Sequence, residues 1–196
     1  GSDTSFGFDL FASVINKDLN GVLGNFVSRV LKMTASKLGE TVPAGGEWTS
    51  MENDLAANLQ KHVDDYIKYM DELEFRKAMN ELRAIWVEGN NYITAAEPWT
   101  VIKTDEARAS CILRTCINLI RLFAVMSAPI MPQTSENMLQ RLGLSLKNMP
   151  SLSGFDVKSQ LQAVVAGTPF SVGELLFERI TPEKVEELKQ KYGSNS

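Results

Sequence analysis

The stretch CILRTCINLIRLFAVMSAP, residues 111–129, decides the fold class of this chain. It lies in a predicted helix from about Asp105 to Ala128. That helix is apolar on most of its sides, which is typical of a helix surrounded by other elements. Pro129 and Pro132 are expected to break it, because proline cannot continue an α-helix. We therefore predict a fold in which this helix is central and the most buried.

Amphipathic patterns on both sides of this stretch predict further helices, with glycine and proline between them. These helices span about residues 8–38, 51–72, 74–96 and 134–142. Thr181 and Pro182 then predict the N-cap and first position of a last helix that runs to about Tyr192. No strand pattern is convincing, so we predict an all-α antiparallel helix bundle of about five helices.

The chain divides into three predicted parts. Residues 1–7 are interpreted as an expression scar and linker, because the chain opens with Gly1 and Ser2. Residues 8–143 are predicted to form the bundle. Residues 144–196 lack a clean period over most of their length and are predicted to be an irregular C-terminal extension, packed on the bundle and ending in the short last helix.

Composition and charge exclude several classes of protein. The 196 residues carry a net charge of −4, which argues against non-specific binding to DNA or RNA, since that binding depends on basic residues neutralising phosphates. No apolar run of about 18 residues and no secretory signal are seen, so we predict no membrane span and a cytoplasmic location. Cys111 and Cys116 lie about 140° apart on a helix, so neither a disulfide nor a shared metal is expected.

No known catalytic motif is found in the sequence. The patterns GxxxxGK[ST], GxGxxG and HExxH are missing. His62 is the single histidine; it is interpreted as a solvated surface side chain without an orienting partner. We therefore predict no catalytic residue, no metal site and no cofactor for this chain.

Three side chains remain as candidates for binding. Asn25 and Arg29 lie one turn apart on one flank of the first predicted helix, about 100° and 60° from Phe26 at the centre of its apolar stripe. An amide and a guanidinium are suited to reading the edges of unpaired bases. Trp99 follows Pro98 just past a helix end, where an indole can stack on a splayed-out base. Alternatively, Asn25 and Arg29 cap or bridge helices, and Trp99 anchors the core.

Several stretches resemble the anticodon-binding helix bundle of methionyl-tRNA synthetases, the class I synthetase type. DLNGVLGNFVSR (residues 18–29) is followed by LEFRKAMNEL (73–82) and GNNYITAAEPW (89–99), and then by LIRLFAVMSAPIMPQTSENMLQRLGL (119–144). With these stretches in the family's order, the resemblance covers about residues 8–143.

The resemblance implies a function. In the family, the residues matching Asn25 and Arg29 hydrogen-bond bases of the CAU anticodon of methionine tRNA, and the residue matching Trp99 stacks on the first base, the cytosine. Pro98 shapes the turn, and Asn90 lies near the same surface. The family's ATP and methionine motifs are missing here. The resemblance therefore implies either an excised part of a methionine–tRNA ligase or a free-standing tRNA-binding module, and the apparent scar at the N-terminus favours the first. The implied partners are tRNA and the catalytic domain, and ATP with Mg²⁺ is handled only by that domain.

Two other functions stay open at this point. One is a protein-interaction module that docks a catalytic domain or a synthetase assembly, suggested by the apolar residues of the extension (Phe155, Phe170, Leu175, Leu176 and Phe177). The other is the anticodon bundle of a related class I synthetase.

Overall fold

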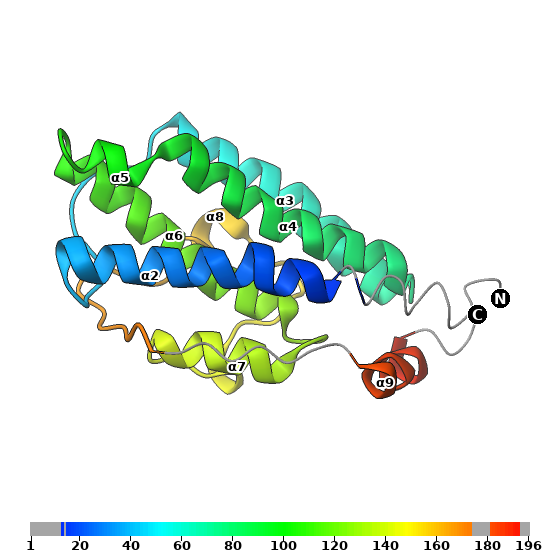
Figure 1. Ribbon diagram of the computed structural model, residues 1–196. Helices are drawn as coiled ribbons and strands as arrows, with labels where there is room; N and C mark the ends of the chain where they lie inside the picture. Colours follow the sequence, from blue (N-terminus) through cyan, green and yellow to red (C-terminus); the bar gives the residue numbers. More distant parts are fainter. Residues whose placement is uncertain (1–12, 14, 174–180, 193–196) are drawn as a thin grey trace.

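The computed structural model describes residues 13, 15–173 and 181–192 (Figure 1). The elements, in chain order, are η1 (Leu19–Gly24, π-helical), α2 (Asn25–Leu38), α3 (Ser50–Asp71), α4 (Phe75–Ala96), α5 (Pro98–Val101), α6 (Glu106–Ser127), α7 (Pro132–Arg141), η2 (Leu146–Asn148, 3-10 helical), α8 (Val157–Gln160) and α9 (Pro182–Tyr192). Within the described residues the β-type pairing is one isolated antiparallel bridge, between Thr41 and Pro169. The predicted all-α class is confirmed.

Helix α6 is the centre of the bundle, as predicted. Every residue from Ala109 to Ser127 is buried except Arg114, and the helix contacts α2, α4, α5 and α7. Among the described residues it is the one helix long and apolar enough to cross a membrane, but 94% of its apolar window is buried inside the protein. Its apolar character is therefore explained by its place in the core.

Helices α3 and α4 form a long antiparallel hairpin (Figure 1), and α4 packs against α6. Helix α3 begins with a capping box, in which Glu52 accepts from the Thr49 backbone N–H and the Thr49 side chain accepts from the helix backbone. Helix α4 ends at Ala96, as predicted. The short helix α5 after it was not predicted, because four residues show no period.

The start of α7 corrects one prediction. Helix α6 ends at Ser127, before Pro129 and Pro132, as predicted, but the next helix, α7, begins at Pro132 and not near residue 134. Proline is well suited to that position, because its missing N–H has no partner within the helix there and its backbone angle is already helical.

The first helix is not regular, which corrects a second prediction. Its stripe was predicted with α-helical spacing throughout, but Leu19–Gly24 is π-helical and lies between α-helical residues 15–18 and helix α2, which begins at Asn25. Short π-helical turns inside α-helices are often found at functional sites. The predicted start near residue 8 lies outside the described residues.

The extension packs on the bundle where the structure describes it. Phe155 and Phe170 are buried in the common core. Gln60 of α3 donates to the Phe155 carbonyl and accepts from the Val157 N–H. Residues 40–42 and 167–170 pair through three backbone hydrogen bonds of 2.8–3.0 Å. Leu175, Leu176 and Phe177 lie outside the described residues.

Candidate nucleic-acid interface

Arg29 and Trp99 meet on the surface of the bundle. The guanidinium carbon of Arg29 lies 4.4 Å from the centroid of the Trp99 ring, over its face. Arg29 is exposed, and Trp99 is half-buried and packs against the core. The described residues provide no ion pair or hydrogen bond for the Arg29 guanidinium, so its donors are free to bind a ligand. The contact brings α2 and α5 together, as a shared binding surface requires.

Asn25 lies one turn before Arg29, at the junction of η1 and α2. Its side-chain amide donates to the Gly21 carbonyl over 3.2 Å. Its backbone N–H bonds to the Val22 carbonyl. The side-chain oxygen has no hydrogen bond within the part of the chain that the structure describes. Asn25 is exposed, so this acceptor and the Arg29 donors are offered on one flank of α2.

Asn90 supports the same region from α4. Its side-chain amide donates to the Val22 carbonyl over 3.3 Å, so it ties α4 to the π-helical turn beside Asn25. The preceding residue, Gly89, lies against Phe123 of α6, and a Cβ at this position would be 2.4 Å from the phenyl ring. This close packing of α4 on α6 fixes where Asn90 presents its amide.

The turn that carries Trp99 is built by two residues. Glu97 has a φ of +48°, the left-handed region that a non-glycine residue rarely adopts. Pro98 is buried and is the first residue of α5. A residue before proline is disfavoured in the right-handed helical region, so α4 stops and the chain turns sharply into the helix that holds Trp99.

A buried carboxylate lies behind this turn. Glu52 of α3 is fully buried, and its two oxygens accept from both terminal nitrogens of Arg108 at 2.6 and 2.7 Å. The Tyr92 hydroxyl donates to the same carboxylate over 2.7 Å. Burial by itself would raise the pKa of Glu52, but the bonds from Arg108, the Thr49 backbone and Tyr92 outweigh it and hold that pKa below its ordinary value.

Sequence reasoning did not identify the Glu52, Tyr92 and Arg108 cluster. One signal was present: Thr49-x-x-Glu52 matches the capping-box pattern, which marks a helix start. The pattern gives no information about Tyr92 or Arg108, which are 40 and 56 residues away. Their pairing with Glu52 depends on the packing of three helices.

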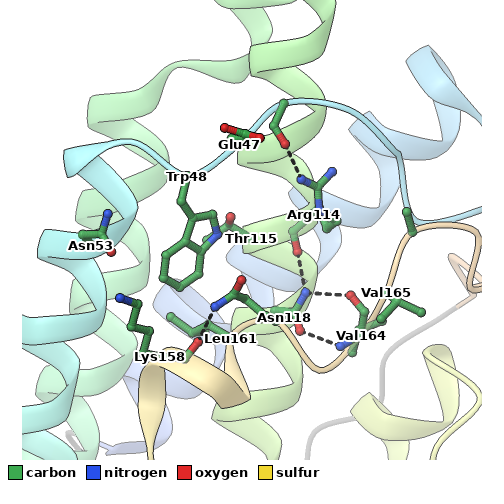
Figure 2. A pocket seen from close by; sticks show the side chains of 13 residues that line it. Glu47, Trp48, Asn53, Arg114, Thr115, Asn118, Lys158, Leu161, Val164 and Val165 are labelled. Atoms are coloured by element: carbon green, nitrogen blue, oxygen red, sulfur yellow. Dashed lines mark hydrogen bonds between the residues drawn. The ribbon is translucent and has the colours of Figure 1, made fainter.

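A separate cavity of about 500 Å³ lies between the 46–48 loop, α3, α6 and residues 158–166. Figure 2 shows Trp48 on one wall, with Arg114 and Asn118 beside it. Arg114 donates to the carbonyls of Pro43, Gly45 and Gly46 at 2.8–3.0 Å. The sequence assigned no role to Trp48. None of the predicted site residues lines this cavity.

His62 differs from its prediction. Its Nδ1 lies 2.7 Å from a carboxylate oxygen of Glu81, and its Nε2 lies 3.9 Å from Glu88. The imidazole therefore has partners on α4 and links the hairpin. Within the described ranges, no group of three or more histidine, cysteine or acidic side chains is arranged to hold a metal ion.

Comparison with known protein families and sequences gives consistent matches. The family model described as the anticodon binding domain of methionyl tRNA ligase matches residues 42–196. The methionine–tRNA ligase of Ruegeria sp. (strain TM1040) is 44% identical over 191 residues, which is 97% of this chain and 33% of the relative. That of Caulobacter vibrioides (strain NA1000 / CB15N) is 43% identical over 193 residues, 98% of this chain and 34% of the relative. The chain thus spans about a third of these relatives.

Solved structures give the same fold. Mycobacterium tuberculosis methionyl-tRNA synthetase in complex with methionyl-adenylate matches with a TM-score of 0.65 at 24% identity, over 85% of this chain and 32% of that one. The apo form of that enzyme matches with a TM-score of 0.63 at 26% identity, over 87% and 34% of the two chains.

Proposed function

Because the chain belongs to the family of anticodon-binding domains of methionyl-tRNA ligase, we propose that it reads the CAU anticodon of methionine tRNA through Asn25, Arg29 and Trp99. Trp99 stacks on the first base, and Asn25 and Arg29 hydrogen-bond to base edges. This assigns the chain the recognition step of tRNA charging.

The Arg29–Trp99 contact is the observation that carries this proposal. The guanidinium lies over the indole face, 4.4 Å from the ring centroid, so a base that takes its place on that face stays within reach of its donors. Unpaired bases are commonly read by this combination of an aromatic or guanidinium plane and hydrogen bonds to exposed edges. The side-chain oxygen of Asn25 adds an acceptor one helical turn away.

Asn90 and Pro98 have supporting roles in the proposed site. The amide of Asn90 bonds to the Val22 carbonyl, which favours a role in holding the π-helical turn beside Asn25. Pro98 is buried, so it shapes the turn and leaves Trp99 as the contact with RNA.

We further propose that the chain acts as one part of a cytoplasmic methionine–tRNA ligase. The relatives are about three times as long as this chain. In that protein a catalytic domain would use ATP with Mg²⁺ to charge the tRNA, with no cofactor held by these 196 residues. Specific reading of a few bases is compatible with the net charge of −4, whereas affinity for DNA or RNA of any sequence is not.

Titration of anticodon stem-loops at low salt tests the proposal. One stem-loop carries CAU, and a second has a different first base. We expect the wild-type chain to prefer CAU, and Trp99→Ala to weaken CAU binding by about 1–3 kcal/mol, the size of one base stack. Trp48→Ala is the matched control, since Trp48 is also half-buried but lies at the separate cavity. Equal binding of both loops by the wild type would refute anticodon reading.

A further inference from the structure

We propose that Glu52 is a positioning residue for base reading. Its buried carboxylate fixes the two helices that flank α5 and thereby sets the position of Trp99. This inference rests on the proposed function, because it concerns how accurately the same site is held. It assigns a role in tRNA selection to a residue that no base can touch, since Glu52 is fully buried.

Helix α5 depends on its neighbours for its position. The backbone hydrogen bonds of residues 97–105 run within that segment or to the adjoining turns of α4 and α6; for example, the Glu97 N–H bonds to Ile93 and the Ile102 N–H to Pro98. A helix of four residues does little by itself to fix its position in the protein. The indole therefore moves with the end of α4 and the start of α6.

Glu52 binds to both of those helix ends. Tyr92 is in the last two turns of α4 and Arg108 is in the first turn of α6. The Tyr92 hydroxyl and the Arg108 guanidinium bond to the carboxylate at 2.6–2.7 Å. The Thr49 backbone N–H, at 2.9 Å, ties the carboxylate to the start of α3. One side chain thus connects three helix ends around the base of the Trp99 turn.

Stability alone is a weak explanation for this cluster. Burying a carboxylate and a guanidinium has a desolvation cost that can equal their attraction, so apolar side chains of similar volume are often as stabilising. What the ion pair adds is geometry, because the two nitrogens of the fork and the two carboxylate oxygens pair in one orientation. A stacking platform needs that accuracy, since a displacement of about 1 Å can be costly at a binding site.

The test measures selectivity rather than affinity alone. The ratio of dissociation constants for the changed-first-base and CAU stem-loops does not depend on how much of the protein is folded. Tyr92→Phe removes one hydrogen bond and keeps the ring, so the protein should fold. We expect it to lower the ratio by at least about threefold, and Arg108→Lys, which keeps the charge but loses the fork, to lower it further.

Tyr66→Phe is the matched control. The Tyr66 side chain is fully buried, and its hydroxyl donates to the Met126 carbonyl over 2.7 Å. It lies about 21 Å along α3 from Glu52. This variant loses the same chemical group and should lose comparable stability, but the ratio should stay at the wild-type value.

The outcomes separate the two proposals. A reduced ratio in Tyr92→Phe with an unchanged ratio in Tyr66→Phe supports the positioning role. An unchanged ratio in both Tyr92→Phe and Arg108→Lys, with wild-type selectivity intact, overturns the positioning role and leaves anticodon reading in place. A wild-type chain that binds CAU no better than the changed loop overturns anticodon reading, and the positioning role with it.

Discussion

Two regions of this molecule combine a tryptophan, an arginine and an asparagine, and they use them in opposite ways. In the first, Arg29 lies over Trp99 and Asn25 is one turn away. In the second, Trp48 faces a cavity beside Arg114 and Asn118. Each combination of residue types is suited to binding a planar ligand. Residue types alone therefore do not distinguish the two regions.

The difference lies in which polar groups are already occupied. Arg114 donates to three backbone carbonyls of the 43–46 loop. Asn118 donates to the Arg114 and Val164 carbonyls and accepts from the Val164 N–H. Arg29 and Asn25 are exposed and keep donors and an acceptor available. The comparison therefore supports a structural role for the polar groups of the Trp48 region and the proposed recognition role for the Trp99 region.

Asn118→Ala should produce the largest effect and tests the structural half of the comparison. The substitution leaves the N–H and C=O of Val164 without their partner inside the protein. We expect the free energy of unfolding to fall by about 2–4 kcal/mol, because each buried polar group left unpaired is costly. Urea unfolding measures this. The folded protein should bind the CAU stem-loop as wild type does, and weakened binding would mean that the Trp48 region takes part in recognition.

Arg29→Ala tests the other half of the comparison. Stability should fall by less than about 1 kcal/mol, since the substitution removes a single exposed cation–π pair. Affinity for the CAU stem-loop should fall by about 1–3 kcal/mol if Arg29 makes a bidentate base contact. Arg76→Ala, on an exposed part of α4, serves as the control for the removal of one positive charge. Unchanged affinity in Arg29→Ala would exclude Arg29 from base reading.

A pH titration of stability examines the carboxylate beneath the Trp99 turn. The pKa of Glu52 lies below its ordinary value of 4.5, so its contribution to stability is present above that value. The contribution is lost as pH falls through the folded-state pKa, because the unfolded chain then binds the proton more readily. The stability difference between wild type and Glu52→Gln should shrink from neutral pH towards acid pH. A constant difference in urea unfolding would show that the charge of Glu52 contributes nothing.

The smallest effect is expected for Lys32→Ala. Lys32 is exposed three residues after Arg29, on the same flank of α2. If it contacts one phosphate of the loop, its removal lowers the slope of log affinity against log salt by about 0.7. The preference for CAU should stay the same. Lys61→Ala on α3 is the control, and equal slopes for the two variants would mean that Lys32 makes no phosphate contact.

The sequence predicted those parts of the molecule that depend on local chemistry. The central position of helix α6 was predicted because its own residues are apolar on most of its sides. The Trp99 turn was predicted because Pro98 constrains the backbone of the residue before it. Arg29 and Asn25 were selected because polar residues stand out at the edge of an apolar stripe. Their roles with RNA remain predictions, but their placement on one surface with Trp99 is a property of the fold.

Other features depend on contacts that no local pattern reports. The π-helical turn from Leu19 to Gly24 shifts the helical register without changing the order of apolar residues. The partners of Glu52 come from α4 and α6. His62 was interpreted as an isolated surface side chain because Glu81, on the other arm of the hairpin, is 19 residues away. The misses at Glu52 and His62 each involve a partner brought close only by packing.

The pairing of residues 40–42 with 167–170 has a consequence for synthesis of the chain on the ribosome. The N–H of Val42 bonds to the carbonyl of Thr168, and its own carbonyl accepts from Gly167. These partners are translated about 125 residues later, which takes roughly 6–25 s at ordinary elongation rates. During that interval the α3–α4 hairpin can form from neighbouring segments, while the loop leading to Trp48 waits for the extension to emerge. A nascent chain therefore holds every segment of its proposed recognition surface before it can close the contact between residues 40–42 and the extension.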